Sequence, residues 1–271
     1  GLVVCPGFID LHCHSDMSIL LNNKAESRLV QGITTDVTGN CGSAPHTFAH
    51  EFRGEMSREL SRWAKREVEV DWRTLAEWKT KLVEKGIGVN IAPFCGFGTI
   101  RTSGMGKEGE GGERHEPASD ELSHMKELVK VAMEQGAFGM TTGLEYAPQW
   151  NAYTEEVIEL CNVVARYGGL YMSHLRSEDF WFPDAVKEFI RICRESGLRG
   201  CISHFKVCCK EHWGESVEAL RLIDEARGEG VDIMCDLYPW LYPAVTDVGS
   251  FLISPEEKID EMKDEVMEKL R

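Results

Sequence analysis

Seven short apolar runs alternate along this chain with segments of helical periodicity. The runs are rich in β-branched residues and lie near residues 3–12, 33–38, 89–94, 137–142, 170–174, 200–204 and 231–237. Between most of them, apolar residues recur three and four positions apart, as at Leu122, Met125 and Val129, and this spacing predicts amphipathic helices. Such alternation is typical of repeated βα units. The sequence therefore predicts an α/β fold, a (β/α)8 barrel of the TIM type, in a single domain over residues 1–271.

The barrel is expected to be incomplete. Seven strands and a charged final helix at residues 255–271 fit a barrel that stops before its eighth strand. A stretch rich in Gly and Glu between Thr102 and Ala118 is predicted to be a mobile βα loop. Because the first apolar run opens at the first residues, we expect the natural N-terminus to lie upstream.

Charge and cysteine content narrow the class of partner. The 271 residues include 45 acidic and 30 basic side chains, a formal net charge of −15, which disfavours binding to nucleic acids and membrane surfaces because both are polyanionic. No run is long and apolar enough to span a membrane, and no signal-peptide pattern is present. The ten cysteines lack the spacing of a disulfide framework, and adjacent Cys208 and Cys209 indicate incidental thiols more than a redox site. The sequence predicts a reduced, cytoplasmic protein with a small-molecule partner, and an oligomer remains possible.

Candidate metal ligands fall where the predicted strands end. His12 and His14 close the first strand, His174 and His204 close the fifth and sixth, and Cys41 follows the second. Reactive groups of barrels gather at the carboxyl ends of strands, and residues i and i+2 of a strand point to the same side. Any one of these residues alone is more often structural, but imidazoles and a thiolate together predict a zinc site rather than a magnesium or calcium site. The remaining histidines are predicted to be surface residues: His46, His50, His115, His124 and His212.

A family resemblance covers most of the chain, from Pro6 to about Tyr238. The chain resembles the N-acyl-D-amino-acid deacylases (D-aminoacylases) of the amidohydrolase superfamily in the motifs "PGFIDLHCHSD", "GITTDVTGNCG", "GAFGMTTGLEYAP", "SHLRSE", "ISHFK" and "DLYP". The "HCH" pattern marks the superfamily only. "GNCG" and "GLEYAP" are much more specific to this branch.

The resemblance implies a particular ligand set. Cys41, His174 and His204 would hold one tight zinc ion, and His12 and His14 would complete a second, weaker position with Cys41. In this family the cysteine replaces the carboxylated lysine that bridges the metals of many relatives. The absence of lysine from "AFGMTTGL", in the fourth strand, agrees with the cysteine variant.

The resemblance also implies residues for the substrate. Lys206, Tyr146 and Tyr238 would hold the substrate carboxylate, and Arg176 of the "SHLRSE" motif is a further substrate-binding candidate. An ammonium and phenolic hydroxyls suit that role because they offer hydrogen-bond donors to a carboxylate. From the residues alone, a salt bridge for Lys206 and packing for the tyrosines would be the simpler interpretation.

Two departures from the family pattern qualify this expectation. After the third strand the family has "GH", whereas this chain has Phe97 in place of the histidine. The family's catalytic acid/base is an aspartate at the end of strand eight, which lies outside the chain, so the catalytic residue is unknown. Asp236 is a poor substitute because the resemblance makes it part of the "DLYP" turn. The segments that form the family's small β domain are also expected to be absent.

The predicted function is zinc-dependent hydrolysis of the amide bond of N-acyl-D-amino acids to a carboxylate and a free D-amino acid. Zinc would polarise the amide carbonyl and activate water. The alternatives are cyclic amide hydrolysis of the dihydroorotase or hydantoinase kind, which normally favours the strand-four lysine, and a non-catalytic zinc-binding barrel fragment. Because the strand-eight aspartate is expected to be missing, we predict that these 271 residues bind zinc yet hydrolyse the substrate poorly.

Overall fold

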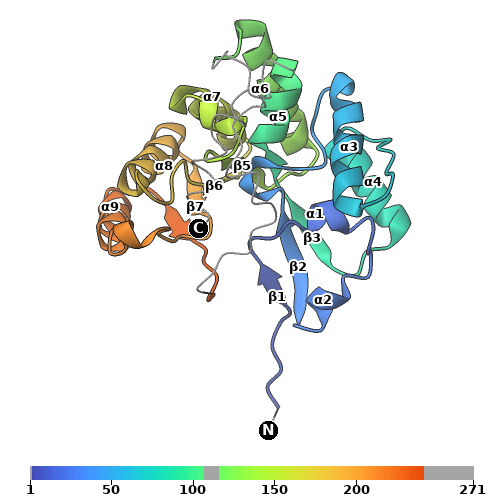
Figure 1. The fold of residues 1–271 in the computed structure, drawn as a ribbon, viewed down its shortest axis with the longest axis horizontal. Coiled ribbons are helices and arrows are strands. Elements are labelled where there is room, and N and C mark those ends of the chain that lie inside the picture. The colour runs from blue at the N-terminus through green and yellow to red at the C-terminus, as the bar shows by residue number, and fades with distance from the viewer. Residues whose placement is uncertain (1, 107–115, 241–271) are drawn as a thin grey trace, which may run out of the picture.

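The computed structural model describes residues 2–106 and 116–240 as a parallel α/β fold (Figure 1). Every strand pairing within these residues is parallel, in two sheets of chain order. The first sheet contains β1 (Phe8–Asp10), β2 (Ile33–Thr38) and β3 (Asn90–Pro93). The second contains β4 (Cys95–Gly96), β5 (Gly139–Gly143), β6 (Leu170–His174), β7 (Arg199–Ile202) and β8 (Ile233–Cys235).

The two sheets form one curved wall because β3 and β4 are two halves of an interrupted strand. Only Phe94 separates them, and its N–H donates to the carbonyl of Thr38 in β2 at 2.9 Å. On the other side, the N–H of Phe138 donates to the carbonyl of Pro93 at 2.8 Å. The wall therefore has strands at the seven positions that the apolar runs predicted, in the order expected of a barrel.

The first strand is much shorter than its apolar run. Strand β1 begins at Phe8, and Leu2, Val3 and Val4 lie outside any strand and are exposed. The prediction of a strand from residue 3 is therefore wrong for residues 3–7, since the β-branched residues there have no partner strand in the described structure.

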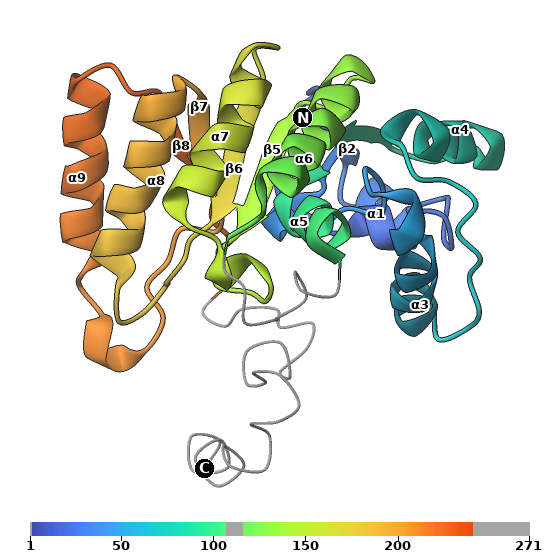
Figure 2. The ribbon, with the colours of Figure 1, turned by 90° about the horizontal axis from the view of Figure 1, so that it is seen from above.

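Helices pack on the outer side of the wall (Figure 2). Against the second sheet lie α6 (Ser119–Glu134), α7 (Thr154–Ala165), α8 (Phe182–Ser196) and α9 (Ser216–Gly228), and α3 (Arg53–Ala64) and α4 (Leu75–Lys85) lie nearer the first. Helix α8 shows why these segments are helical: Val186, Phe189, Ile190 and Cys193 recur at helical spacing and are all buried. It ends at Gly197, whose φ of 69° is the left-handed conformation that stops a helix.

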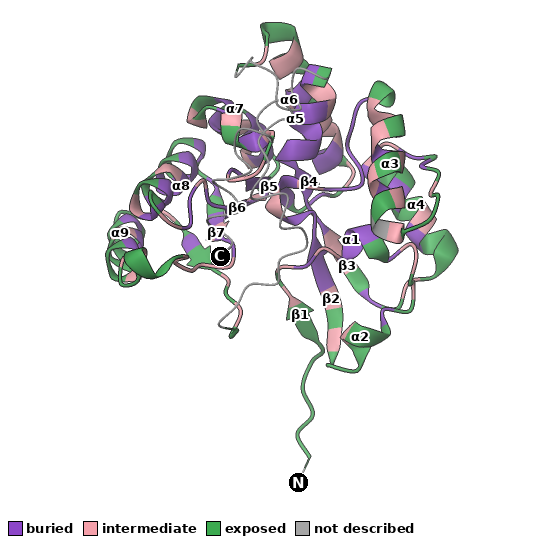
Figure 3. Cartoon of the chain, viewed as in Figure 1, coloured by how far each residue is buried: buried purple, intermediate pink, exposed green. Residues whose placement is uncertain are grey.

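Short elements link the strands to these helices at the carboxyl end of the wall. They are α1 (Ser15–Ser18), α5 (Phe97–Met105) and the 3-10 turns η1 (Asn40–Gly42), η2 (His50–Phe52), η4 (Gln149–Asn151) and η5 (Lys210–His212). Helix α2 (Glu26–Leu29) instead lies at the amino end, just before β2. Buried residues concentrate where the helices face the sheet (Figure 3). A second, small cluster of Val37, Phe94 and Met172 lies on other strand faces and is distinct from that core.

Two sequence expectations need correction. Residues 102–105 belong to α5, so the loop predicted after Thr102 begins later; residues 107–115 and the helix predicted at 255–271 lie outside the described residues. His46 is fully buried, with its ring 5.1 Å from that of Trp78, so the prediction that it is a surface residue is wrong. His50 and His124 are exposed as predicted, His212 is half-buried, and His115 is not among the described residues.

Within residues 2–106 and 116–240, no helix combines the length and apolar character needed to cross a membrane.

Candidate metal centre

All five residues proposed as metal ligands meet at the carboxyl end of the wall. His12 and His14 follow β1, Cys41 is the central residue of η1, His174 ends β6 and His204 follows β7. The ligand atoms of His12, His14 and Cys41 all lie within 4.8 Å of one another, and so do those of Cys41, His174 and His204. Cys41 therefore belongs to both groups. Parallel strands bring these side chains together because their carboxyl ends meet at one rim.

Cys41 lies at the centre of this cluster in a strained backbone conformation. Its Sγ atom is 3.3 Å from Nε2 of His12 and 3.7 Å from Nε2 of His204. Its φ of 54° and ψ of 28° are left-handed, and His204 also has a positive φ, of 37°. Such conformations are uncommon for residues with a Cβ and concentrate at functional sites.

The cluster combines a thiolate with imidazoles. Burial alone would raise the pKa of the Cys41 thiol, but hydrogen bonds from His12, His14, His174 and His204 hold its pKa well below the usual range. For the two imidazoles burial acts in the opposite direction and lowers the pKa. Contacts with Asp236 and Cys41 nevertheless raise the pKa of His12 to about 10. Contacts with Cys41 and Glu145 raise the pKa of His174 to about 9. A soft anion surrounded by imidazole nitrogens is a donor set that fits zinc.

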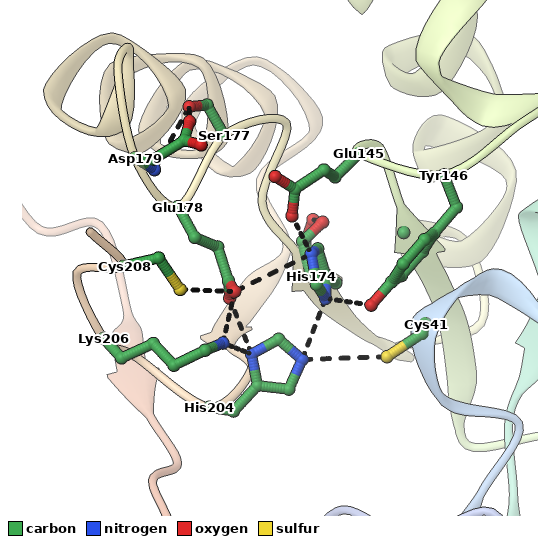
Figure 4. Close-up of polar contacts among 12 residues, drawn as sticks. Cys41, Glu145, Tyr146, His174, Ser177, Glu178, Asp179, His204, Lys206 and Cys208 are labelled. Atoms are coloured by element: carbon green, nitrogen blue, oxygen red, sulfur yellow. Dashed lines mark hydrogen bonds and ion pairs between the residues drawn. The ribbon is translucent and has the colours of Figure 1, made fainter. Parts of the chain in front are cut away.

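Two carboxylates hold the outer nitrogens of the histidines (Figure 4). Nε2 of His174 lies 2.6 Å from Oε2 of Glu145, and Nδ1 of His204 lies 2.8 Å from Oε1 of Glu178. The inner nitrogens, Nδ1 of His174 and Nε2 of His204, lie 3.0 Å apart beside Cys41. Histidines that ligate metals typically have such carboxylate partners, which fix the ring orientation and the tautomer. Sequence reasoning missed both glutamates, although they lie within the quoted "GLEYAP" and "SHLRSE" motifs.

Glu178 also connects the histidines to Lys206. Its carboxylate pairs with the Lys206 ammonium, whose Nζ lies 3.2 Å from Nδ1 of His204. Burial would raise the pKa of Glu178, but His204, His174 and Lys206 lower it to about 2. Burial lowers the pKa of Lys206, and Glu178 more than offsets that effect, so both groups are charged at neutral pH.

Of the two tyrosines proposed to bind substrate, Tyr146 contacts a proposed zinc ligand, and Tyr238 lies near Lys206. The hydroxyl of Tyr146 is 3.1 Å from Nδ1 of His174, and the Lys206 Nζ lies 5.8 Å from the ring centre of Tyr238. Burial, and then the negative charge of Cys41, raise the pKa of Tyr146, which keeps its phenol protonated.

Arg176 is occupied by contacts within the chain. Its guanidinium pairs with Glu188 through two bonds of 2.8 Å and donates to the carbonyls of Trp150 and Ala152 at 2.8 and 2.9 Å. Four of its five N–H groups are engaged in these bonds. The geometry therefore gives Arg176 a structural role between η4 and α8, and its binding to substrate is a prediction that the contacts do not favour.

The two departures from the family pattern have clear positions. Phe97, where the family has histidine, begins α5 and is fully buried in the main core. Asp236 follows β8; its backbone N–H donates to Ile202 and its Oδ1 accepts the N–H of His204 at 2.5 Å. These bonds suit the expected turn role. Its Oδ2 also lies 3.6 Å from Nδ1 of His12, a contact that the sequence did not indicate.

Comparison with known proteins gives a consistent set of relatives. No family model matches the chain. It is 35% identical over 242 residues to a D-aminoacylase of Alcaligenes xylosoxydans xylosoxydans. The aligned residues cover 89% of this chain and 48% of the relative. An N-acyl-D-glutamate deacylase of the same organism is 32% identical over 266 residues, 97% of this chain and 51% of the relative. The chain thus spans about half the length of these curated relatives.

Solved structures agree. The crystal structure of a D-aminoacylase, described as defining a novel subset of amidohydrolases, matches with a TM-score of 0.76 and 33% identity over 87% of this chain and 48% of that one. The N-acyl-D-glutamate deacylase from Bordetella bronchiseptica, complexed with zinc and a phosphonate mimic of the tetrahedral intermediate, matches with a TM-score of 0.77 and 31% identity over the same shares of the two chains. The described residues share the fold of about half of each of these proteins.

Proposed function

The chain belongs to the N-acyl-D-amino-acid deacylase family of amidohydrolases, and from this premise we propose that the protein hydrolyses the amide bond of N-acyl-D-amino acids with the help of zinc. The observation that carries the proposal is the position of Cys41, whose sulfur is shared by the His12/His14 pair and the His174/His204 pair. The substrate class is supported by the names of the relatives, which act on N-acyl-D-amino acids.

Cys41, His174 and His204 are proposed to hold the tight zinc ion, and His12 and His14 a weaker one with Cys41. We base this order of zinc affinity on the carboxylates that hold the histidines. In both His174 and His204, a carboxylate lies within 2.8 Å of the ring nitrogen that faces away from Cys41. Nδ1 of His12, by contrast, is 3.6 Å from Asp236. When bound, zinc supplies a Lewis acid that polarises the amide carbonyl.

The chain's own side chains are proposed to bind and orient the substrate. The Lys206 ammonium attracts the substrate carboxylate, and Tyr146 and Tyr238 add phenolic donors. Fixing the carboxylate orients the scissile amide relative to the metal ligands. The resemblance assigns proton transfer to an aspartate after the eighth barrel strand. Because β3 and β4 are two halves of one strand, β8 takes the seventh barrel position, and Asp236 is not that aspartate. We assign proton transfer to none of the described residues.

The cellular setting proposed is the cytoplasm. All ten cysteines are free of disulfide bonds, which supports a reducing compartment. A small N-acylated amino acid is the proposed partner, with no role for nucleic acid or membrane.

Zinc analysis and a stereospecific assay test the proposal together. The purified protein is expected to contain about one tightly held zinc ion per chain. A version that includes the aspartate to which the resemblance assigns proton transfer is expected to act on N-acyl-D-amino acids in preference to the L-enantiomers. Absence of zinc, with none taken up on addition, would remove the metal centre, and preference for the L-enantiomer would contradict the substrate class.

Lys206→Met tests the substrate anchor, in a version of the protein that includes the aspartate to which the resemblance assigns proton transfer. It is expected to raise KM strongly without lowering zinc content, because Lys206 holds the carboxylate and is not a ligand. Lys187→Met is the matched control, since Lys187 is exposed and pairs with Asp184, away from the metal centre. Unaltered kinetics in Lys206→Met would return this lysine to a structural role.

A further inference from the structure

The loop that carries Cys41 is held by buried polar side chains from other parts of the chain. Asp16 accepts the N–H of Gly39 at 2.8 Å, and the hydroxyl of Thr141 accepts the N–H of Gly42 at 3.0 Å. These contacts fix the residues on either side of Cys41. Gln149 of η4 reaches the backbone of Cys41 itself.

The Gln149 amide bridges Cys41 and the end of β5. Its Nε2 donates to the carbonyl of Cys41 at 3.0 Å, and its Oε1 accepts the N–H of Gly143 at 2.7 Å. Only this orientation of the amide satisfies both bonds, because one partner accepts and the other donates. Gln149 is 4% exposed, so water cannot readily replace it.

The surroundings of this amide leave no room for other side chains. A Cβ at Gly42 would overlap Oε1 of Gln149, and a Cβ at Gly98 would lie 2.7 Å from its Nε2. The backbone just before Gln149 is also held in place, because buried Arg101 donates to the carbonyl of Pro148 at 3.1 Å. The amide therefore lies in a close-fitting pocket lined by glycines.

We infer that Gln149 is a positioning residue, which holds the carbonyl of Cys41 and thereby aims the Cys41 sulfur at the histidines. A residue with a Cβ is disfavoured in the left-handed region, and Cys41, at φ 54°, stays there only if its surroundings fix it. Relaxation to a right-handed conformation would turn the Cα–Cβ bond and carry the sulfur away from the ring nitrogens. The inference rests on the metal centre proposed above and adds a residue to it that touches no metal.

The test replaces Gln149 by Met, which is similar in length but cannot make either hydrogen bond. Gln135→Met is the matched control, because Gln135 also bonds a backbone N–H, that of Ala76 at 2.9 Å, but at the exposed end of α6. Zinc affinity is measured by competition with a chelator. We expect Gln149→Met to lose about 10- to 100-fold in affinity, the usual cost of removing a group that orients a ligand, and Gln135→Met to match the wild type.

Two further readouts separate positioning from simple packing. In the cobalt-loaded protein, the thiolate-to-cobalt charge-transfer band is expected to weaken or shift in Gln149→Met and to stay unchanged in the control. If Gln149 only packs, its loss lowers the melting temperature of the apo and zinc-loaded forms equally and leaves affinity and spectrum unchanged, which would overturn the inference. A wild-type protein that takes up no metal would instead overturn the metal centre itself.

A milder variant covers the case in which Gln149→Met does not fold. Gln149→Asn keeps the amide but is one methylene too short to bridge both backbone groups, and the same loss of affinity is expected. If neither variant folds, amide exchange of Gly143 is compared in apo and zinc-loaded wild-type protein. Zinc is expected to slow this exchange, because Gln149 joins Gly143 to Cys41, and identical rates would overturn the inference.

Discussion

Substitution of Glu178 by Gln probes the metal centre through a residue that is not a proposed ligand. The Glu178 side chain is buried and accepts hydrogen bonds from Nδ1 of His204 and from Lys206. Gln has nearly the same size and can still accept one hydrogen bond, but it has no charge. The variant therefore removes the electrostatic contribution to the orientation and basicity of His204 while leaving the packing almost intact.

The expected magnitude follows from the geometry. The contact between His204 and Glu178 spans 2.8 Å, and Glu178 remains ionised at neutral pH because its pKa is about 2. Groups in this position typically contribute about 10- to 100-fold to metal affinity, which corresponds to about 1.4 to 2.7 kcal/mol. We expect the dissociation constant for zinc to rise by that factor in Glu178→Gln.

The assay is competition with a chromophoric chelator, with Glu188→Gln as the control. Glu188 is also a partly buried carboxylate paired with a cation, Arg176, but it contacts none of the proposed ligands. Both variants lose a charge pair, so both are expected to lose some thermal stability. Only Glu178→Gln is expected to lose zinc affinity, and equal losses in the two variants would refute the argument.

Two further predictions use single sites. Cys41→Ala is expected to release more zinc on dialysis than His12→Ala, because Cys41 belongs to both ligand groups and His12 to one; equal zinc contents by elemental analysis would contradict the proposed order. Arg101→Met is expected to reduce the free energy of unfolding in urea by about 3 to 5 kcal/mol, because it leaves the buried Glu156 carboxylate without its charge partner. A loss below about 1 kcal/mol would show that the buried pair contributes little.

The sequence predicted the order of strands well because most strands are short apolar runs separated by helical segments. It failed where burial depends on distant segments. Val3 and Val4 have strand-like side chains but no partner strand within the described residues, so they are exposed. His46 is polar and lies in a loop, yet Trp78 from α4 packs over it and buries it. Neither outcome can be obtained from local composition.

In the candidate site, too, the sequence predicted some residues and missed others. His12, Cys41 and His174 could be placed from sequence because barrel topology alone brings strand ends together. Glu145 and Glu178 could not, because each follows its strand in a loop whose path decides which ring nitrogen it reaches. Their presence in the "GLEYAP" and "SHLRSE" motifs was a signal, but motif membership does not state a hydrogen-bond partner.

The contact between Lys206 and Glu178 is compatible with Lys206 as a substrate anchor. An ammonium has three N–H donors, and Glu178 accepts one of them. Burial lowers the pKa of Lys206 and the Glu178 carboxylate raises it, so this contact favours the charged form of the anchor before substrate arrives. The same carboxylate holds His204 at 2.8 Å. Glu178 thus connects the proposed metal ligands to the proposed carboxylate site, and Glu178→Gln is expected to raise KM as well as weaken zinc binding. In a version of the protein that includes the aspartate to which the resemblance assigns proton transfer, saturation with zinc separates the two effects. If KM returns to the wild-type value at saturation, Glu178 acts on the metal alone, and its proposed role in supporting Lys206 is wrong.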